Sequence, residues 1–299
     1  MKNILVTGAT GPLGMGVITN LLTKISAKHV YGLARSEERA APLKALGVNV
    51  RIGDYDDFTS LVDAFKGIDS LYMVSNTDAS KRISQQNNVV EAAIETGISR
   101  VVYTSYQRNN ESIDSPLRAI AEGHLNTEAK LKESGISYTV LMHGVYADLI
   151  PILIGSDVVA NQHIYFPAGE GKASFVFRSD LAEAGAIILL DETGQYDNKF
   201  LELSGHKALS WGEIAEIIGS ITNLPIKYVA PSVEGYTKVL TDAGAPAGVV
   251  NFLAKVGIAM KGGEFDKTSP VLKELLGHEL TPIKTFLKGI YGVKPAVVA

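Results

Sequence analysis

Short apolar runs alternate with longer segments of helical periodicity through the first 145 residues of the chain. Apolar and β-branched runs predict strands at 3–7, 29–34, 48–52, 70–74, 100–104 and 138–141. Apolar positions that recur every three or four residues predict helices at 13–22, 58–65, 81–96 and 117–134. This alternation is typical of an α/β fold, a Rossmann-type doubly wound parallel sheet with right-handed crossovers.

The alternation loosens after about residue 145. A turn-rich loop precedes a short predicted strand at 174–177, and Ser179 or Asp180 is the predicted N-cap of the helix that follows. Residues 199–203 predict the last strand of the main sheet. Beyond it, Ser210 is predicted to cap a helix, and helical patterns interrupted by Gly and Pro continue to the end of the chain.

Three glycines at three-residue spacing follow the first predicted strand. They stand in the segment Gly8-Ala9-Thr10-Gly11-Pro12-Leu13-Gly14, directly before the first predicted helix. Gly8 allows a sharp turn, Gly11 allows the backbone to approach a pyrophosphate, and Gly14 allows the helix to pack closely on the sheet. Free N–H groups at the helix start then bind the phosphates. We interpret the segment as a dinucleotide-binding loop, and the alternative is a glycine-rich turn that binds nothing.

Arg35 and Ser36 follow the second predicted strand, where a dinucleotide fold meets the adenosine ribose. An acidic residue there binds the 2′-hydroxyl of NAD, whereas an arginine accommodates the 2′-phosphate of NADP. The guanidinium of Arg35 and the hydroxyl of Ser36 suit a phosphate. We therefore predict NADPH as the cofactor. NADH is the alternative, for the case in which Arg35 only stacks on the adenine.

Polar residues follow the next predicted strands at the same edge of the sheet. Asp54 and Tyr55 follow the third strand and are candidates to contact the adenine, while Asp57 is the predicted N-cap of the next helix. Ser75 and Asn76 follow the fourth strand and are candidates to face the nicotinamide ribose. Ligands of doubly wound sheets bind beyond the carboxyl ends of the strands, which is where all these residues fall.

These patterns predict two domains. Residues 1–145 and about 180–203 form the dinucleotide-binding domain. Residues about 146–179 and 204–299 form a smaller, mostly α-helical substrate-binding domain that covers the nicotinamide end of the cleft.

The composition excludes several other kinds of site. The chain has no cysteine, which excludes disulfides and thiolate nucleophiles and fits a reducing cytoplasm. The net charge of −4 gives no general electrostatic footprint for nucleic acid. The apolar run that starts at residue 4 breaks too early for a signal peptide, and the run at 184–190 is too short to span a bilayer. None of the six histidines stands in a metal-spaced pair, so no metal is predicted.

Several motifs along nearly the whole chain carry a resemblance to a known family. They are the glycine segment, Arg35, Gly53-Asp54-Tyr55, Tyr103-Thr104-Ser105, His124-Leu125-Asn126-Thr127-Glu128, Gly262-Gly263-Glu264-Phe265-Asp266 and Leu276-Gly277-His278. With these motifs the sequence resembles atypical short-chain dehydrogenases of the NmrA-like group. Within the group it is similar to the bacterial branch of type 2 NAD(P)H:quinone oxidoreductases and triphenylmethane reductases.

The resemblance implies a set of NADPH contacts. It places them in the glycine segment, at Arg35, and at Val74, Ser75, Asn76, Leu141, His143, Gly144 and Tyr146. The chain departs from its relatives at one point, because they have Leu-Arg-Asn-Gly where it has Leu141-Met142-His143-Gly144. The arginine and asparagine of the relatives are thus replaced beside the expected nicotinamide pocket, and this replacement affects which acceptor the pocket selects.

The catalytic pair of most short-chain dehydrogenases, Tyr-x-x-x-Lys, is missing from the predicted helix at 117–134. The resemblance places Ile120 at the tyrosine position and His124 at the lysine position. Reduction of a simple ketone generates a strongly basic alkoxide and needs the proton that this pair supplies. A quinone yields a stabilised hydroquinone anion, and a cationic dye yields a neutral product. The missing pair therefore fits direct hydride transfer to an electron-poor acceptor.

Three ring-bearing side chains are candidates for the acceptor pocket. Tyr106, His143 and Tyr146 follow strand ends at the cofactor edge and could stack on a planar acceptor, and His143 and Tyr146 are the candidate catalytic proton donors. Plain packing or loop hydrogen bonding is the alternative for each. We interpret His124 as a structural residue, with Glu128 one helical turn on as its partner.

The sequence thus predicts an NAD(P)H-dependent reductase that transfers hydride to quinones or similar conjugated acceptors. The first alternative is a non-catalytic NADP(H)-sensing regulator of the NmrA type, which binds the cofactor without turnover. A nucleotide-sugar epimerase or dehydratase is the third hypothesis, and the missing pair disfavours it. The predicted partner is a small quinone-like molecule, and a homodimer is left open because related folds often dimerise.

Overall fold

A seven-stranded, entirely parallel sheet forms the centre of the computed structural model, which describes residues 2–155 and 157–292. Its strand order is β3-β2-β1-β4-β5-β6-β9. The strands are β1 (Ile4–Val6), β2 (Val30–Ala34), β3 (Asn49–Ile52), β4 (Ser70–Met73), β5 (Arg100–Tyr106), β6 (Ser137–His143) and β9 (Lys199–Leu203). The strand order reverses between β1 and β4, so the predicted doubly wound Rossmann-type sheet is confirmed.

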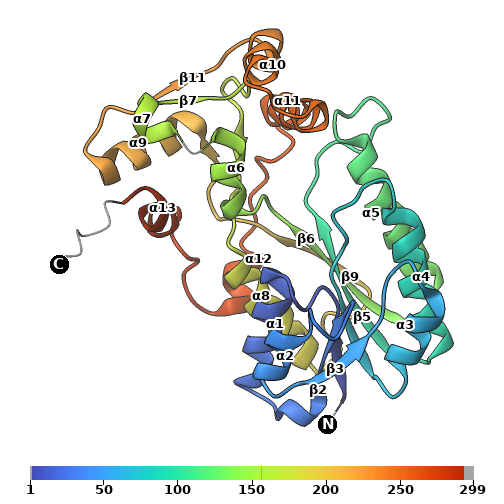
Figure 1. Ribbon diagram of the computed structural model, residues 1–299. Helices are drawn as coiled ribbons and strands as arrows, with labels where there is room; N and C mark the ends of the chain where they lie inside the picture. Colours follow the sequence, from blue (N-terminus) through green and yellow to red (C-terminus); the bar gives the residue numbers. More distant parts are fainter. Residues whose placement is uncertain (1, 156, 293–299) are drawn as a thin grey trace.

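Helices cover both faces of the sheet (Figure 1). One face carries α1 (Pro12–Leu22), α8 (Arg178–Leu190) and α12 (Val271–Leu276). The other face carries α3 (Phe58–Phe65), α4 (Arg82–Glu95) and α5 (Arg118–Glu133). The short elements η1 (Ala27–His29) and α2 (Ala41–Ala45) lie in the connections on either side of β2.

The first helix shows how the sequence builds this packing. Pro12 takes the first helical position, where its missing N–H costs no hydrogen bond, and Gly11 is the N-cap. Val17, Ile18 and Leu21 recur on one face of the helix and are fully buried. Full burial of each such side chain is worth roughly 1.5–3 kcal/mol, which holds α1 on the sheet and on α8.

Two of the predicted helix caps are confirmed. The carboxylate of Asp57 accepts a hydrogen bond from the Ser60 N–H at 3.1 Å at the start of α3. Ser210 forms a capping box with Glu213 at the start of α9 (Trp211–Thr222). Both caps satisfy N–H groups that have no partner inside their helix.

The predicted cap of α8 by Ser179 or Asp180 is wrong. The helix starts at Arg178 after the N-cap Phe177, so both residues lie in its first turn. The buried carboxylate of Asp180 instead accepts hydrogen bonds from the N–H and hydroxyl of Thr281, at 2.9 and 2.7 Å. Asp180 thus binds a residue from a distant part of the chain instead of the N–H groups at the start of its own helix.

The fifth and sixth strands are longer than the sequence pattern predicts. They run to Tyr106 and His143 instead of residues 104 and 141, and these two last residues are register partners. The Gln107 N–H continues the ladder by donating to the carbonyl of His143 at 2.8 Å. Polar and aromatic side chains weaken a strand pattern in the sequence, but here they continue two strands that pair in register.

A second group of elements packs around its own apolar cluster, with Trp211 and Phe166 at the centre. It contains two small sheets, β7 (His163–Tyr165) with β11 (Lys227–Val229) and β8 (Lys172–Ala173) with β10 (Leu209–Ser210). Its helices are η2 (Ala147–Leu149), α6 (Ile150–Ile154), α7 (Val158–Asn161), α9, α10 (Val233–Asp242), α11 (Ala247–Lys261) and α13 (Ile283–Tyr291). The strand predicted at 174–177 is misplaced, because the strand lies at β8 and only Val176 of that range forms a bridge, to Tyr146.

The chain returns to the sheet near its end. Leu272 and Leu276 of α12 are buried in the same cluster as α1 and α8, whereas α13 packs against α9. The two-domain division predicted from the sequence stays a prediction. Among residues 2–155 and 157–292, no helix has both the length and the apolar character that crossing a membrane requires.

Replacing Gly14 with alanine should lower the free energy of unfolding by about 1–3 kcal/mol, because the added carbon overpacks α1 against the backbone of the glycine loop after β1. A Cβ at this position would stand 2.5 Å from the Gly8 carbonyl oxygen and 2.9 Å from the Ala9 Cα. Urea unfolding of the Gly14→Ala variant checks the prediction. The matched control is Gly289→Ala in α13, where a Cβ meets nothing within 4 Å. Equal stability of the two variants would contradict the packing argument.

Candidate active site

A cavity of about 960 Å³ lies along the carboxyl edge of the parallel sheet. Residues at or just after the ends of all six strands from β1 to β6 contribute to its wall. The cavity continues between the sheet and the second group of elements, where α6 and α11 supply Ile152, Leu153, Phe252 and Val256. One connected space therefore joins the predicted cofactor loop to the predicted acceptor pocket.

Most of the site residues predicted from the sequence line this cavity. They are Gly8, Thr10, Gly11, Pro12, Leu13, Gly14, Arg35, Tyr55, Val74, Ser75, Asn76, Tyr106, His143, Gly144 and Tyr146. Their roles as cofactor or acceptor contacts stay predictions, but their common position agrees with the strand-end argument.

Four predicted residues lie outside the cavity wall. Ala9 and Leu141 are fully buried in the core, and Leu141 lies inside β6 because that strand is longer than predicted. The Ser36 hydroxyl accepts a hydrogen bond from the Arg39 N–H, and the Asp54 carboxylate accepts one from the N–H two residues on. These two polar side chains close local turns, and their cofactor contacts stay predictions.

The glycine loop has the geometry that a diphosphate needs. Gly8 has a φ of +56°, and the Gly11 N–H donates to the Gly8 carbonyl at 2.9 Å to close a tight turn. Among the residues that the structure describes, no side chain caps α1 and no acidic residue stands in its first turn. The free N–H groups and the positive end of the helix dipole therefore fit the phosphates of NADPH.

Two arginines and a tyrosine line the part of the cavity expected to hold the adenosine. Arg35 and Arg39 are four residues apart in the bend and turn that follow β2 and are both exposed, and the sequence argument named only Arg35. The hydroxyl of Tyr55 donates to the Val74 carbonyl at 2.9 Å and contacts the Thr7 hydroxyl at 2.5 Å. Tyr55 therefore also braces the ends of β1 and β4 against each other.

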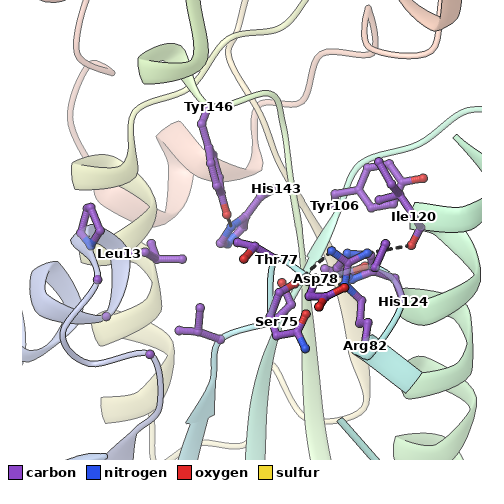
Figure 2. Close-up of a pocket in the computed structure, with 18 of the residues that line it drawn as sticks. Leu13, Ser75, Thr77, Asp78, Arg82, Tyr106, Ile120, His124, His143 and Tyr146 are labelled. Atoms are coloured by element: carbon purple, nitrogen blue, oxygen red, sulfur yellow. Dashed lines mark hydrogen bonds between the residues drawn. The ribbon is translucent and has the colours of Figure 1, made fainter. Parts of the chain in front are cut away.

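The guanidinium of Arg82 is buried in the cavity wall (Figure 2). This first residue of α4 is 6% exposed. Its Nε and Nη2 donate to the Asn76 carbonyl at 3.1 and 3.0 Å, and its Nη1 donates to the Ile120 carbonyl at 3.2 Å. Burial lowers the pKa of Arg82, but a guanidinium stays protonated in proteins. Arg82 thus ties the segment after β4 to α5 and brings a positive charge to the cavity.

His143 and Tyr146 point toward each other in the cavity (Figure 2). The Nδ1 of His143 lies 3.0 Å from the Tyr146 hydroxyl. Burial, and then the charge of Arg178, lowers the pKa of His143 to about 3, so its imidazole is neutral at physiological pH. Among the described residues, its buried Nε2 has no hydrogen-bond partner. If the tyrosine donates to Nδ1, the neutral ring carries its hydrogen on Nε2 and offers a donor to a ligand.

Tyr146 is held on its other side by Arg178. The guanidinium carbon of Arg178 lies 4.1 Å from the centre of the tyrosine ring, and the same guanidinium forms an ion pair with Asp148. Burial raises the pKa of Tyr146 to about 12, so the phenol stays protonated and can donate to His143. The arrangement fixes the ring orientation of both residues.

Tyr106 stands beside His143 because the two are register partners at the ends of β5 and β6. Its buried hydroxyl has no hydrogen-bond partner within the part of the chain that the structure describes. The ring of His124 lies 5.1 Å from the ring of Tyr106, and its Nδ1 contacts the Tyr103 hydroxyl at 2.7 Å. Burial, and then the charge of Arg82, holds the pKa of His124 well below its usual range, so this ring is also neutral.

Glu128 is not the partner of His124, and that prediction is corrected. Its carboxylate accepts hydrogen bonds from Arg108 Nη2 at 2.7 Å and from the Ser105 hydroxyl at 2.6 Å. The spacing of four residues places His124 and Glu128 on one face of α5. A buried carboxylate requires a cation, however, and Arg108 supplies it, while Tyr103 of β5 contacts the histidine.

Apolar side chains from α5, α6, α11 and the neighbouring loops form the rest of the cavity wall. They are Leu117, Ile120, Leu149, Ile152, Leu153, Phe252, Val256 and Phe265. Ile152 and Phe252 are also 63% and 46% exposed, so this apolar surface reaches the outside of the protein. Such a wall with few polar atoms suits a planar, largely apolar ligand.

The sequence argument missed Arg39, Arg82 and Arg178 as cavity residues. Arg39 follows Arg35 by four residues, and this spacing was the available signal for a second phosphate ligand. Arg82 and Arg178 each begin a helix, and no local pattern tells a buried arginine at a helix start from an exposed one. Their placement depends on backbone carbonyls, rings and carboxylates that the fold brings together.

Comparisons with known proteins place this site in a family. The chain is 32% identical to quinone oxidoreductase 2 of Escherichia coli over 293 residues, 97% of this chain and 99% of that protein. Its structure is similar to that of Citrobacter sp. triphenylmethane reductase complexed with NADP(H), with a TM-score of 0.87 and 34% identity over 96% of this chain and 99% of that one. The NADPH complex of the E. coli quinone oxidoreductase gives a TM-score of 0.87 at 29% identity over 97% and 100% of the two chains. The model of the NmrA-like family matches residues 1–280, and the chain belongs to the NmrA-like family.

Proposed function

We propose that this chain is an NADPH-dependent reductase that transfers hydride to quinones or similar conjugated electron acceptors. The observation that carries the proposal is the connected cavity, which joins the glycine loop to an apolar pocket with two unpartnered buried hydrogen-bond groups, on His143 and Tyr106. Two relatives support this class, because one is named for quinones and another for triphenylmethane dyes. Both kinds of acceptor are conjugated and electron-poor.

The cofactor site is assigned to residues along the sheet edge. The N-terminus of α1 binds the diphosphate, and Arg35 and Arg39 bind the 2′-phosphate that distinguishes NADPH from NADH. Ser75 and Asn76 follow β4 and face the nicotinamide ribose. Bound NADPH supplies the hydride, and the protein contributes binding, orientation and the electrostatic environment of the acceptor.

The acceptor chemistry needs no strong protein acid. Helix α5 contains no tyrosine, and the neutral His124 has no charge with which to lower the pKa of a neighbouring phenol. A quinone that gains a hydride becomes a hydroquinone monoanion, whose phenolate charge is far less basic than an alkoxide. Water can protonate this anion, so positioning of the acceptor is the main task of the protein.

His143 and Tyr106 position the acceptor oxygen. Tyr146 donates its hydroxyl hydrogen to Nδ1 of His143, and the Nε2 hydrogen then points to the ligand. This donor stabilises the negative charge that develops on the acceptor oxygen during hydride transfer, and the Tyr106 hydroxyl is a further donor to the acceptor. His143 is the candidate catalytic residue, and Tyr146, which acts through it, is a positioning residue.

The proposal also includes a cytoplasmic location and a homodimeric state. The absence of cysteine fits a reducing compartment. Two-fold symmetric dimers are the commonest homo-oligomers, and size-exclusion chromatography with light scattering would test a dimer here.

The purified protein should consume NADPH in the presence of a benzoquinone, because one connected cavity joins the glycine loop to the apolar pocket. The measurement is the absorbance of NADPH over time, with a control without enzyme, since quinones react slowly with NADPH alone. Tight NADPH binding without turnover above this control, across a broad quinone panel, would contradict the proposal and favour the sensing regulator. Conversion of a nucleotide sugar would favour the epimerase.

Arg35→Ala should reduce kcat/KM for NADPH by roughly 10- to 100-fold and leave kcat/KM for NADH nearly unchanged, since hydrogen bonds to a charged phosphate are lost. Steady-state kinetics with both cofactors measures the two effects. Arg51→Ala is the matched control, because Arg51 stacks on Tyr31 outside the cavity. A similar loss with both cofactors would assign Arg35 to the adenine instead of the phosphate.

The rate of quinone reduction should be nearly independent of pH between about pH 5.5 and 8.5. His143 gains a proton only near pH 3 and Tyr146 loses one only near pH 12, so both stay neutral across this window. We expect His143→Phe to lower kcat/KM by roughly 10- to 100-fold at every pH, because the variant lacks the hydrogen-bond donor. His143→Asn keeps a side-chain N–H donor and should keep most of the wild-type kcat/KM. The measurement is kcat/KM against pH. A fall in kcat/KM near neutral pH that is present in wild type and absent in His143→Phe would contradict the prediction, because it would show that His143 titrates during turnover.

A further inference from the structure

We infer that the buried guanidinium of Arg82 sets the charge class of the acceptor. It favours uncharged carbonyl compounds whose reduction produces an anion, and it disfavours cationic acceptors such as triphenylmethane dyes. The inference rests on the proposed reductase function and deepens it, because it names the substrate class of the same cavity.

Three arginines lie in or behind the wall of the acceptor part of the cavity, because Arg82 and Arg178 line it and Arg108 stacks on Tyr106. Two of the three are neutralised by carboxylates. Arg108 forms an ion pair with Glu128 at 2.7 Å, and Arg178 forms one with Asp148. Arg82 has no carboxylate within ion-pair distance among residues 2–155 and 157–292, and its N–H groups bind two backbone carbonyls. Arg82 is therefore the arginine, of these three, that has no carboxylate partner for its charge.

The fold makes room for this side chain. Gly123 faces it from α5, and a Cβ there would stand 2.7 Å from the Arg82 Cδ. Together with the carbonyls of Asn76 and Ile120, this contact holds the guanidinium at one place in the wall. A cation held in this way acts on a ligand as a fixed charge and loses little orientation energy when charge develops nearby.

Within the part of the chain that the structure describes, two acids line the cavity, and neither forms an ion pair with Arg82. Asp78 faces the cavity near Arg82 but is exposed, so water and salt screen its charge. Asp56 is also exposed and pairs with Lys81. Burial raises the pKa of Glu264, the acid beside Tyr106, which favours its neutral form. The neutral ring of His124 adds no further cation, so Arg82 brings an unpaired positive charge to the acceptor pocket.

The effect of this charge differs between two acceptor classes. A neutral quinone gains a hydride, which brings one hydrogen and two electrons, and becomes a hydroquinone monoanion that later takes a proton from water. Arg82 stabilises the developing anion more than the neutral quinone and so lowers the barrier. A cationic dye gains the same hydride and becomes neutral. Arg82 repels the dye when it binds and gives its product no compensating attraction.

A charge series at position 82 tests the inference. Arg82→Met and Arg82→Gln remove the charge, Arg82→Lys keeps it, and Arg51→Met makes the same loss of charge outside the cavity. The first readout is the ratio of kcat/KM for a neutral naphthoquinone to kcat/KM for crystal violet, a cationic triphenylmethane dye. The second is the Kd of crystal violet for the cofactor-free protein, measured from the shift of its absorbance.

The two uncharged variants should lower the quinone-to-dye ratio at least about tenfold and bind crystal violet several times more tightly than wild type. Arg82→Lys should keep the ratio within about threefold, and Arg51→Met should leave both readouts unchanged. The side-chain amide of Arg82→Gln retains a donor for the backbone carbonyls, which provides an uncharged variant if methionine disrupts the fold. Thermal unfolding and NADPH affinity identify the variants that fold as wild type does.

Folded uncharged variants that keep the wild-type ratio and dye affinity would overturn the inference. An Arg82→Lys variant whose quinone-to-dye ratio falls as far as that of Arg82→Met would also overturn the inference. The hydrogen bonds of the arginine, and not its charge, would then set the ratio. Failure of the proposed function has a different signature, the absence of quinone turnover in wild type. Dye binding by the cofactor-free protein still decides the charge effect in that case.

Discussion

The parallel register of the central sheet is the constraint on which both halves of the site depend. Parallel strands bring all their carboxyl ends to one edge, so the glycine loop after β1 and the side chains at the ends of β5 and β6 open into the same cavity. The pairing of Tyr106 with His143 places their side chains on one face. A shift of one residue in either strand would turn one of them into the core, because side chains alternate between the faces of a sheet.

Burial keeps the titratable side chains at the proposed acceptor end of this edge uncharged. Desolvation keeps His124 and His143 neutral and keeps the phenol of Tyr146 protonated. The buried Arg108 and the half-buried Arg178 are matched by carboxylates, and the remaining positive charge belongs to Arg82. What is left is an apolar wall with hydrogen-bond donors and one fixed cation. Such a pocket is adapted to an oxygen that gains negative charge and not to a group that must receive a proton from the protein.

The features that could be predicted from the sequence are those set by neighbours in the chain. The glycine loop, the alternation of strands and helices and the caps at Asp57 and Ser210 depend on residue types a few positions apart. The features that could not be predicted depend on contacts between distant segments. Asp180 looked like a cap but binds Thr281, and His124 looked like the partner of Glu128 but contacts Tyr103. Local spacing restricts which residues share a face, whereas tertiary packing decides which of them pair.

The lack of a tyrosine in α5 and the burial of Arg82 are linked by geometry. Ile120 occupies the position where the resemblance places the tyrosine of other short-chain dehydrogenases, and its carbonyl accepts a hydrogen bond from Arg82. Three residues on, Gly123 leaves the space that the arginine side chain fills. A lysine in that helix would supply both a positive charge and, through the tyrosine, a proton. Arg82 supplies the charge from the neighbouring helix without the proton. The proposed function accordingly restricts the acceptors to those whose reduced anion survives until water protonates it, which quinones satisfy and simple ketones do not.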